Sequence, residues 1–205
     1  IKSNIILKKQ ESIGIWPAFN EAYDLSSGEF LAVINSDDYY YDSNVLYKVH
    51  LELDSKNLDY CYGNSQRVDM NKGYLYLQKP LSFLKKSNYD FFVFNISHHS
   101  LFFRKEVLNN ISFYPSKTNA VDLEFVRNLY KSNYVGAYLD LTVACFRIHD
   151  NNFSSTYSRL DTTKLFVEWN GLPEIFFTFS RLVVFVSNPR YFLFYLKRLV
   201  KGFLL

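Results

Sequence analysis

The segment Glu29–Asn35 constrains the fold more than any other part of the chain. It reads Glu-Phe-Leu-Ala-Val-Ile-Asn, and a nearly continuous apolar run of this kind is typical of a central parallel strand that is buried on both faces. The run leads directly into Ser36-Asp37-Asp38. Because open α/β sheets bind ligands at the carboxyl ends of their strands, we expect Asp37 and Asp38 to face a crevice. Paired carboxylates there can hold a hard divalent cation, although aspartates are also common in ordinary turns.

Strands alternate with helices along the rest of the chain, which predicts a layered α/β fold. Apolar residues at helical spacing predict a helix over 15–25, with Gly28 as its left-handed cap. Ser43 is expected to be the N-cap of a helix that reaches Lys56. The remaining expected strands are Ile5–Leu7, Leu58–Val68, Gly73–Leu77, Ser97–Phe103 and Tyr134–Ile148, and the remaining helices are Arg104–Asn109 and Val121–Tyr130.

The composition fits one globular domain. With 205 residues, 48% hydrophobic and 21% charged, the chain can bury a substantial core, and wholesale disorder is excluded. The net charge of +3 is mild, and no basic stripe interleaved with aromatic residues precedes the C-terminal region, so we expect no nucleic-acid partner. Cys61 and Cys145 lie in apolar runs, which indicates buried, reduced thiols and fits a cytoplasmic protein.

Five further positions carry side chains that could do chemistry. His149 follows the last expected core strand and could bind a metal, while Arg147 could face a phosphate. A single histidine in a loop is, however, more often a polar surface group. Asp122 opens a predicted helix, where a carboxylate is also favoured by the helix dipole. His98 and His99 are adjacent, so on the alternate faces of a strand only one of them can point into a cleft.

The order of these motifs resembles that of family 2 glycosyltransferases. The resemblance covers about residues 14–154 and depends on five ordered motifs. The first two are Gly14-Ile15-Trp16-Pro17-Ala18-Phe19-Asn20 with Ser27-Gly28-Glu29, and Asn35-Ser36-Asp37-Asp38; the others are His98-His99-Ser100-Leu101-Phe102-Phe103-Arg104, Val121-Asp122-Leu123-Glu124-Phe125-Val126-Arg127, and Arg147-Ile148-His149 with Asn152 and Ser154.

The resemblance implies a GT-A-like (Rossmann-like) mixed sheet flanked by helices, and an inverting transfer from a nucleotide-sugar donor, most simply a UDP-sugar. It implies that a divalent metal, Mn²⁺ or Mg²⁺, is bound by Asp38 and His149. Asp122 is then the base that deprotonates the acceptor hydroxyl. The donor-binding residues are Asn20, Asp37 and Arg147, and the acceptor region contains His98 and Glu124.

The sequence departs from the family pattern in several places. Pro17 stands where Asp is usual, Glu21 where Lys is usual, and His99 where Gln is common. The family begins with a strand, a loop, a helix and a second strand that precede the position of Ile1. The resemblance therefore implies an N-terminally incomplete catalytic domain over 1–154, with an unpaired sheet edge and exposed apolar side chains.

A helical, amphipathic C-terminal extension is expected over 155–205. On a helical wheel from Arg190 to Lys201, the basic residues fall within roughly one quadrant and apolar residues cover the rest. No apolar stretch reaches the roughly 18 residues that a spanning helix needs. A basic amphipathic helix favours the surface of an anionic membrane, and the alternative is packing against the core. We thus expect a cytoplasmic protein that is peripheral at the inner face of the membrane.

The sequence therefore predicts a hexosyltransferase-type enzyme that acts on a glycan or lipid-linked acceptor in cell-surface polysaccharide synthesis. Two alternatives remain open. A nucleotidyltransferase also uses metal-binding aspartates on an α/β sheet, but the Gly-rich basic phosphate loop expected of one is not found in the sequence. The other alternative is a non-catalytic binding or membrane-docking module left by truncation, which nucleotide binding in the presence of Mn²⁺ would distinguish from an enzyme.

Overall fold

A six-stranded mixed sheet forms the centre of the protein. The computed structural model describes residues 5–9, 14–80, 96–111, 121–149, 152, 159–186, 189–190, 192–193 and 196. The strand order is β1-β5-β3-β6-β2, and β4 pairs with β3. The strands are β1 (Phe30–Ala32), β2 (Tyr39–Tyr40), β3 (Tyr60–Val68), β4 (Tyr74–Gln78), β5 (Leu101–Arg104) and β6 (Gly136–Arg147).

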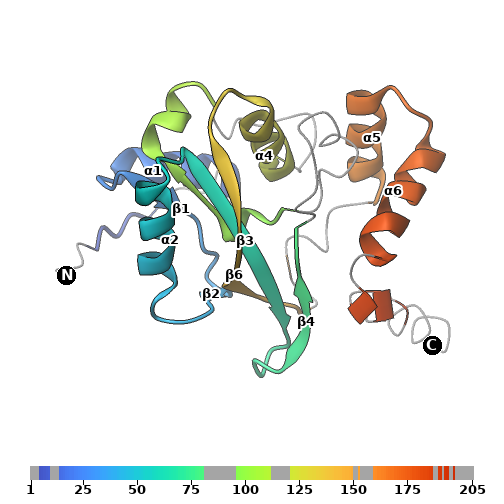
Figure 1. Cartoon of the computed structure of the whole chain (residues 1–205), viewed down its shortest axis with the longest axis horizontal. Coiled ribbons are helices and arrows are strands. Elements are labelled where there is room, and N and C mark those ends of the chain that lie inside the picture. The colour runs from blue at the N-terminus through green and yellow to red at the C-terminus, as the bar shows by residue number, and fades with distance from the viewer. Residues whose placement is uncertain are drawn as a thin grey trace.

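Helices lie on both sides of the sheet (Figure 1). The 3₁₀ helix η3 (His98–Ser100) leads directly into β5, and the 3₁₀ helix η4 (Lys105–Asn109) follows β5. The α-helices are α1 (Ile15–Leu25), α2 (Val45–Ser55), α4 (Val121–Lys131), α5 (Arg159–Asn170) and α6 (Glu174–Val186). The expected mixed α/β architecture is therefore confirmed.

The long strands β3 and β6 form the one parallel pair among the described strands, and they lie at the centre of the sheet. Their register runs from Tyr60 opposite Gly136 to Val68 opposite Arg147. The other pairings, of β1, β2, β4 and β5, are antiparallel. Gly136 allows the close start of this pair, because a Cβ there would lie 1.9 Å from Cζ of the Tyr60 ring.

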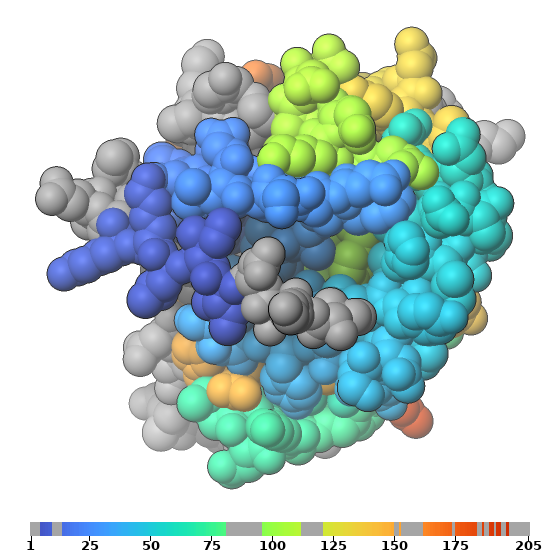
Figure 2. Space-filling view, turned by 90° about the vertical axis from the view of Figure 1, so that its left-hand side faces the viewer, coloured from blue at the N-terminus to red at the C-terminus, as the bar shows by residue number. Residues whose placement is uncertain are grey.

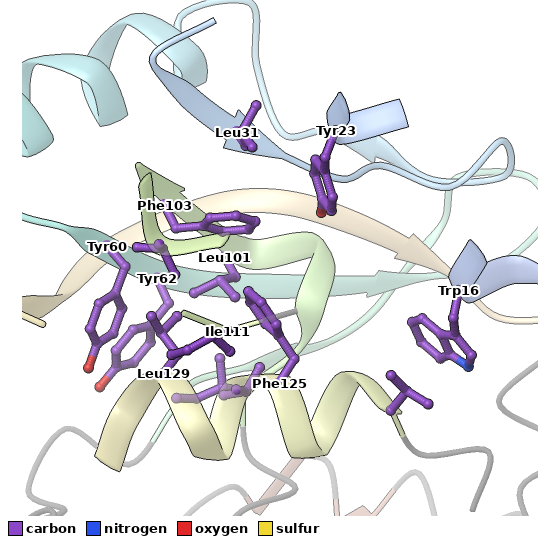
Figure 3. Packing of buried hydrophobic residues seen from close by; sticks show 14 residues of the cluster. Trp16, Tyr23, Leu31, Tyr60, Tyr62, Leu101, Phe103, Ile111, Phe125 and Leu129 are labelled. Atoms are coloured by element: carbon purple, nitrogen blue, oxygen red, sulfur yellow. The ribbon is translucent and has the colours of Figure 1, made fainter. Parts of the chain in front are cut away.

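The larger hydrophobic core fills the space between the sheet and α4 (Figure 3). Phe125 and Leu129 of α4 are at most 1% exposed, as is Phe103 of β5. Their spacing along α4 matches the apolar face that the sequence predicts over 121–130. Aromatic contacts order this core: Phe103 meets Tyr23 edge to face with 5.6 Å between ring centroids, and it packs against Phe125 in a tilted contact at 5.2 Å.

A second core lies on the α2 side of the sheet. Val45, Val49 and Leu53 come from one face of α2 and pack with sheet residues that include Cys61 and Val143. Both cysteines, Cys61 and Cys145, are free and buried, as the sequence predicts. The sheet is thus covered on both faces, in agreement with the burial of eight of the nine residues of β3.

The N-terminal side differs from the sequence prediction. Residues Ile5–Leu7 form no strand and are 63–95% exposed. The segment Glu29–Asn35 gives only the three-residue β1, which is not central: it lies at the edge of the described sheet and pairs antiparallel with β5. Figure 2 shows this face, with the N-terminal segment beside α1. An apolar run becomes a long central strand only when strands pair with it on both sides, and among the described residues β1 has one partner.

Three predictions of where helices and strands begin or end are also wrong. α1 ends at Leu25, and Ser26 rather than Gly28 caps it, with its hydroxyl donating to the Tyr23 carbonyl at 2.7 Å. α2 begins at Val45 after the N-cap Asn44, not Ser43. The expected strand over 97–103 is shorter, because η3 occupies His98–Ser100 before β5 starts. The amphipathic helix predicted over 190–201 lies largely outside the described residues.

Candidate functional site

The loop between β1 and β2 brings the two aspartates against the end of β6. Tyr39 and Tyr40 of β2 pair antiparallel with Cys145 and Ala144 of β6. This pairing fixes the preceding residues, Asp37 and Asp38, beside the residues that follow β6. Two segments more than 100 positions apart thus meet at one end of the sheet, as the position of a ligand site in an open α/β sheet requires.

Asp37 contacts His149 directly. Its Oδ2 lies 2.8 Å from His149 Nε2. Asn152 holds the histidine in place: its Oδ1 accepts a hydrogen bond from the His149 backbone N–H at 2.7 Å, and its Nδ2 donates to the Arg147 carbonyl at 2.9 Å. The Asp37 and His149 side chains are 34% and 21% exposed, so the pair is reachable from solvent while its geometry is fixed.

Asp38 has a different role in the same loop. Its Oδ1 accepts the backbone N–H of Arg147 at 3.0 Å, and its Oδ2 accepts the Asn35 amide at 3.1 Å. Burial raises the pKa of Asp38 above its ordinary value, and the neighbouring charge of Asp37 adds to this effect, whereas the two hydrogen bonds oppose it. The structure therefore brings Asp38 and His149 to the same end of the sheet, but the carboxylate in contact with the histidine is Asp37.

Asp122 lies in the first turn of α4 and faces His98. Its Oδ2 is 3.1 Å from His98 Nδ1, and the two side chains are 15% and 17% exposed. The other carboxylate oxygen, Oδ1, is buried and has no hydrogen-bond partner within the described part of the chain. A buried carboxylate oxygen without a donor is costly, so this oxygen is suited to receive a hydrogen from a ligand.

The structure also describes three other predicted site residues, Arg147, Asn20 and Glu124. The Arg147 guanidinium is 5.7 Å from the Tyr39 ring centroid, and its buried Nε has no hydrogen-bond partner among the described residues. Asn20 is a half-buried residue of α1. Glu124 is half-buried on α4, two positions beyond Asp122, and so points roughly 160° away around the helix axis.

A second polar cluster, which the sequence did not indicate, lies immediately beside the first and is centred on Arg67. The guanidinium donates to His99 Nε2 at 3.0 Å, to Ser65 Oγ at 3.1 Å and to Ser97 Oγ at 2.9 Å, and it also donates to Gln78. It lies 4.3 Å from the centroid of the Phe146 ring. Only the run of polar residues Asn64-Ser65-Gln66-Arg67 within β3 could have suggested such a cluster.

The structure decides which of the adjacent histidines belongs to the first site. His99 is 2% exposed. Burial, together with the positive charge of Arg67, holds its pKa well below the ordinary value, and it is enclosed by the Arg67 cluster. His98 instead contacts Asp122. This arrangement agrees with the expectation that only one of the two histidines can face a cleft. Both histidines lie, however, in a 3₁₀ turn and not in a strand.

The residues present can contribute to a metal site without completing one. Among the described residues, no group of three or more His, Cys, Asp or Glu side chains is arranged to hold a metal ion. Asp37, Asp38 and His149 nevertheless provide oxygen and imidazole donors of the kind that Mn²⁺ and Mg²⁺ accept. Such an incomplete set fits an ion whose remaining ligands come from a bound phosphate or from water.

A pocket of about 470 Å³ lies apart from these residues, between Ile6, Lys8 and α1. Its α1 residues, among them Ala18, Ala22 and Leu25, share the face of the helix opposite to Trp16 and Tyr23. Trp16 lies near His98, with 6.4 Å between ring centroids. The pocket and the carboxylate cluster therefore lie on different sides of α1.

Comparison with known protein families identifies the family of the chain. The model of the family described as glycosyl transferase family 2 matches residues 2–112, which is more than half of the chain. The chain belongs to glycosyl transferase family 2. The matched region includes Asp37, Asp38 and His98, whereas Asp122 and His149 follow it. No curated protein matches the chain.

Solved structures with the same fold include the S. aureus protein TarS. The structure of TarS residues 1–349 in complex with UDP-GlcNAc matches with a TM-score of 0.58 and 19% identity, over 83% of this chain and 51% of that one. TarS 1–349 in a second structure matches with a TM-score of 0.50 and 19% identity, over 79% and 47%. The chain thus spans about half the length of the TarS chains, and the likeness shows a GT-A-like fold.

Proposed function

We propose that this protein transfers a sugar from a nucleotide-sugar donor to a hydroxyl group of an acceptor. The observation that carries the proposal is the presence of two separate carboxylate sites at one end of the sheet. Asp37 and Asp38, with His149, suit the diphosphate of a donor, and Asp122 has a buried oxygen that is ready to accept a proton. Family membership points to the same chemistry, and the UDP-GlcNAc bound to the structurally similar TarS favours a UDP-sugar as the donor.

In the proposed reaction, Asp122 Oδ1 takes the proton from the acceptor hydroxyl. The hydroxyl oxygen then forms a bond to the anomeric carbon while the bond from that carbon to the diphosphate oxygen breaks. This single displacement inverts the anomeric centre. A divalent ion held by Asp37, Asp38 and His149, when bound, would neutralise charge on the leaving diphosphate. Arg147, whose Nε lacks a partner in the described part of the chain, would donate to a phosphate oxygen.

Donor binding tests this proposal without an identified acceptor. Thermal unfolding is measured with UDP-sugars, UDP or ATP, each with and without Mn²⁺. We expect stabilisation by UDP-sugars and UDP that depends on Mn²⁺ and is lost in Asp37→Asn, while the exposed control Asp54→Asn retains it. Stabilisation by ATP alone would favour a nucleotidyltransferase. The absence of any nucleotide effect would favour a non-catalytic module.

A second proposal concerns the surface of α6, which we infer contacts an anionic membrane. Ile175, Phe179, Leu182 and Val186 recur at intervals of four, three and four residues and are 51–73% exposed, so they form an apolar stripe along one face. The opposite face packs against α5 through Phe177, whose ring centroid is 5.5 Å from that of Phe166. The stripe is therefore an outward face of a helix that is otherwise anchored.

The charge of the C-terminal region favours lipid as the partner of this stripe. From Ile175 to the end of the sequence there are five basic residues and no acidic residue. Within the described residues, no helix is both long and apolar enough to cross a membrane. An apolar helix face with basic neighbours is typical of a helix that lies in the interface of an anionic bilayer. Such a location suits a lipid-linked acceptor.

Vesicle flotation tests this surface. We expect the protein to float with vesicles that contain about 30% anionic lipid and to float less with neutral vesicles, because each basic residue near the surface contributes roughly 1 kcal/mol. Phe179→Glu with Leu182→Glu should abolish flotation, whereas Leu46→Glu with Tyr47→Glu on the exposed face of α2 should not. Equal flotation of both double variants would refute the assignment of this surface.

A further inference from the structure

A continuous line of hydrogen bonds joins the donor-side loop to the proposed base. Asn35 Nδ2 donates to Asp38 Oδ2 at 3.1 Å and lies 3.3 Å from His98 Nε2. His98 Nδ1 lies 3.1 Å from Asp122 Oδ2. The line therefore crosses three elements, namely the loop after β1, the turn η3 and the start of α4.

The chemistry of the groups fixes the direction of each hydrogen bond. The Asp38 carboxylate can only accept, so Asn35 must present its amide nitrogen to it, and that nitrogen carries two hydrogens and no free lone pair. Its second hydrogen therefore points to His98 Nε2, which must be the unprotonated nitrogen of the ring. The ring hydrogen is then on Nδ1, where it donates to Asp122 Oδ2.

Aromatic packing fixes the orientation of the imidazole. The His98 ring centroid lies 6.4 Å from that of Trp16, 6.2 Å from Phe19 and 5.4 Å from His99. Trp16 and Phe19 come from α1, so the ring is held between α1 and the histidine that is anchored in the Arg67 cluster. Because the ring is confined in this way, it can hold Asp122 in one rotamer and leave Oδ1 as the free oxygen.

We propose that Asn35 and His98 are positioning residues that fix Asp122 and tie its orientation to the loop bearing Asp37 and Asp38. The inference rests on the proposed transfer reaction. A donor bound at this loop then fixes the position of Asn35. Asn35 in turn fixes the tautomer of His98, and the His98 ring fixes the orientation of Asp122. Deprotonation of the acceptor is thereby coupled to the presence of the donor, which limits the wasteful reaction of either substrate alone.

Kinetics of substituted full chains tests the positioning role. His98→Phe retains the ring packing without either nitrogen and should lower kcat about 10- to 100-fold, with the donor KM changed less than about two-fold. In His98→Asn the amide nitrogen can occupy the position of Nδ1, so this variant should recover at least half of the loss on a logarithmic scale. His98→Gln places its amide near the position of Nε2 instead, so this variant should not recover the loss of kcat. Equal loss in the Phe and Asn variants would overturn the proposal.

A double-variant comparison separates positioning from a general effect on folding. Once Asp122→Asn has removed the base, His98→Phe should lower the remaining turnover less than about two-fold, because both changes then act on one function. Loss of the same factor in both backgrounds would mean that His98 acts independently of Asp122, and would refute the proposal.

A measurement without substrate distinguishes this proposal from the proposed function. Nitrogen-15 NMR of the imidazole reports which ring nitrogen carries hydrogen. We expect the His98 ring of the unliganded protein to be in the Nδ1–H tautomer alone. In Asn35→Ala, we expect this preference for a single tautomer to be lost. A charged or Nε2–H form would overturn the hydrogen-bond line even in an active enzyme. The expected tautomer in a protein that transfers no sugar would instead overturn the proposed function.

Discussion

Two polar clusters meet at the adjacent residues His98 and His99, and they differ in how completely their charged groups are paired. In the Arg67 cluster, the guanidinium of one buried arginine donates to four side chains and covers the Phe146 ring. The atom of this cluster that is buried without a partner among the described residues belongs to an uncharged group, the Nδ1 of His99. In the Asp37–Asp122 cluster, Asp122 Oδ1 and Arg147 Nε are buried without hydrogen-bond partners among the described residues. A cluster built for stability pairs its groups with each other, whereas one built for binding leaves groups for a ligand.

The comparison predicts that changes in the Asp122 cluster reduce turnover more than stability. In Asp122→Asn, turnover should fall at least about 100-fold, equivalent to about 2.7 kcal/mol, because the base can no longer take the acceptor proton. Donor binding, measured by calorimetry, should be nearly unchanged. Near wild-type turnover would exclude Asp122 as the base and make Glu124 the first alternative.

Changes in the Arg67 cluster should have the opposite effect. Arg67→Leu leaves His99 and the surrounding hydroxyl and amide groups without their donor, so the free energy of unfolding should fall by about 2 kcal/mol. Urea denaturation measures this change. Lys48→Leu is a suitable control, because Lys48 is exposed and its ion pair with Asp42 should contribute little to stability. Equal losses in the two variants would remove the distinction between the clusters.

The pH dependence of stability sharpens the contrast further. Burial lowers the pKa of His99 well below 6.5, so as pH falls the unfolded chain takes up a proton before the folded one. The stability due to neutral His99 is therefore fully present above pH 6.5 and is lost below it, by about 1.4 kcal/mol at pH 5.5. In His99→Gln, which restores the residue common in the family, this part of the loss should vanish. Denaturation of the wild-type protein and of His99→Gln at pH 7.5 and 5.5 measures this loss of unfolding free energy. An equal loss in the two proteins would contradict the prediction.

The smallest expected change concerns Asp38. Because burial raises its pKa, the ionised carboxylate costs stability above the folded-state pKa, and this cost is relieved as pH falls through that value. Asp38→Asn should therefore change the free energy of unfolding at pH 7.5 less than Arg67→Leu does, because removal of the buried charge offsets the loss of one of the two accepting oxygens. The Mn²⁺-dependent stabilisation by UDP-sugar should decrease in the same variant. A clear loss of stability would show that Asp38 belongs with the structural cluster.

The sequence alone determined most elements of the fold and supplied the residues that are proposed for the site. Helical spacing located α1 and α4, apolar runs located β3 and β6, and the order of motifs selected Asp37, Asp122 and His149. These features depend on neighbouring residues or on patterns repeated within one element, and such information is present in a local stretch of chain.

Only the tertiary structure decided how these parts are connected. The apolar run after Glu29 could not reveal that β1 lies at the edge of the described sheet, because edge and centre differ in their partners and not in the strand itself. Nor could the motifs show that His149 contacts Asp37, that His99 lies in the Arg67 cluster, or that Asn35 joins Asp38 to His98. Each of these contacts joins residues that are 32 to 112 positions apart, except the one between Asn35 and Asp38, and packing of the whole sheet is what brings such residues within hydrogen-bond distance.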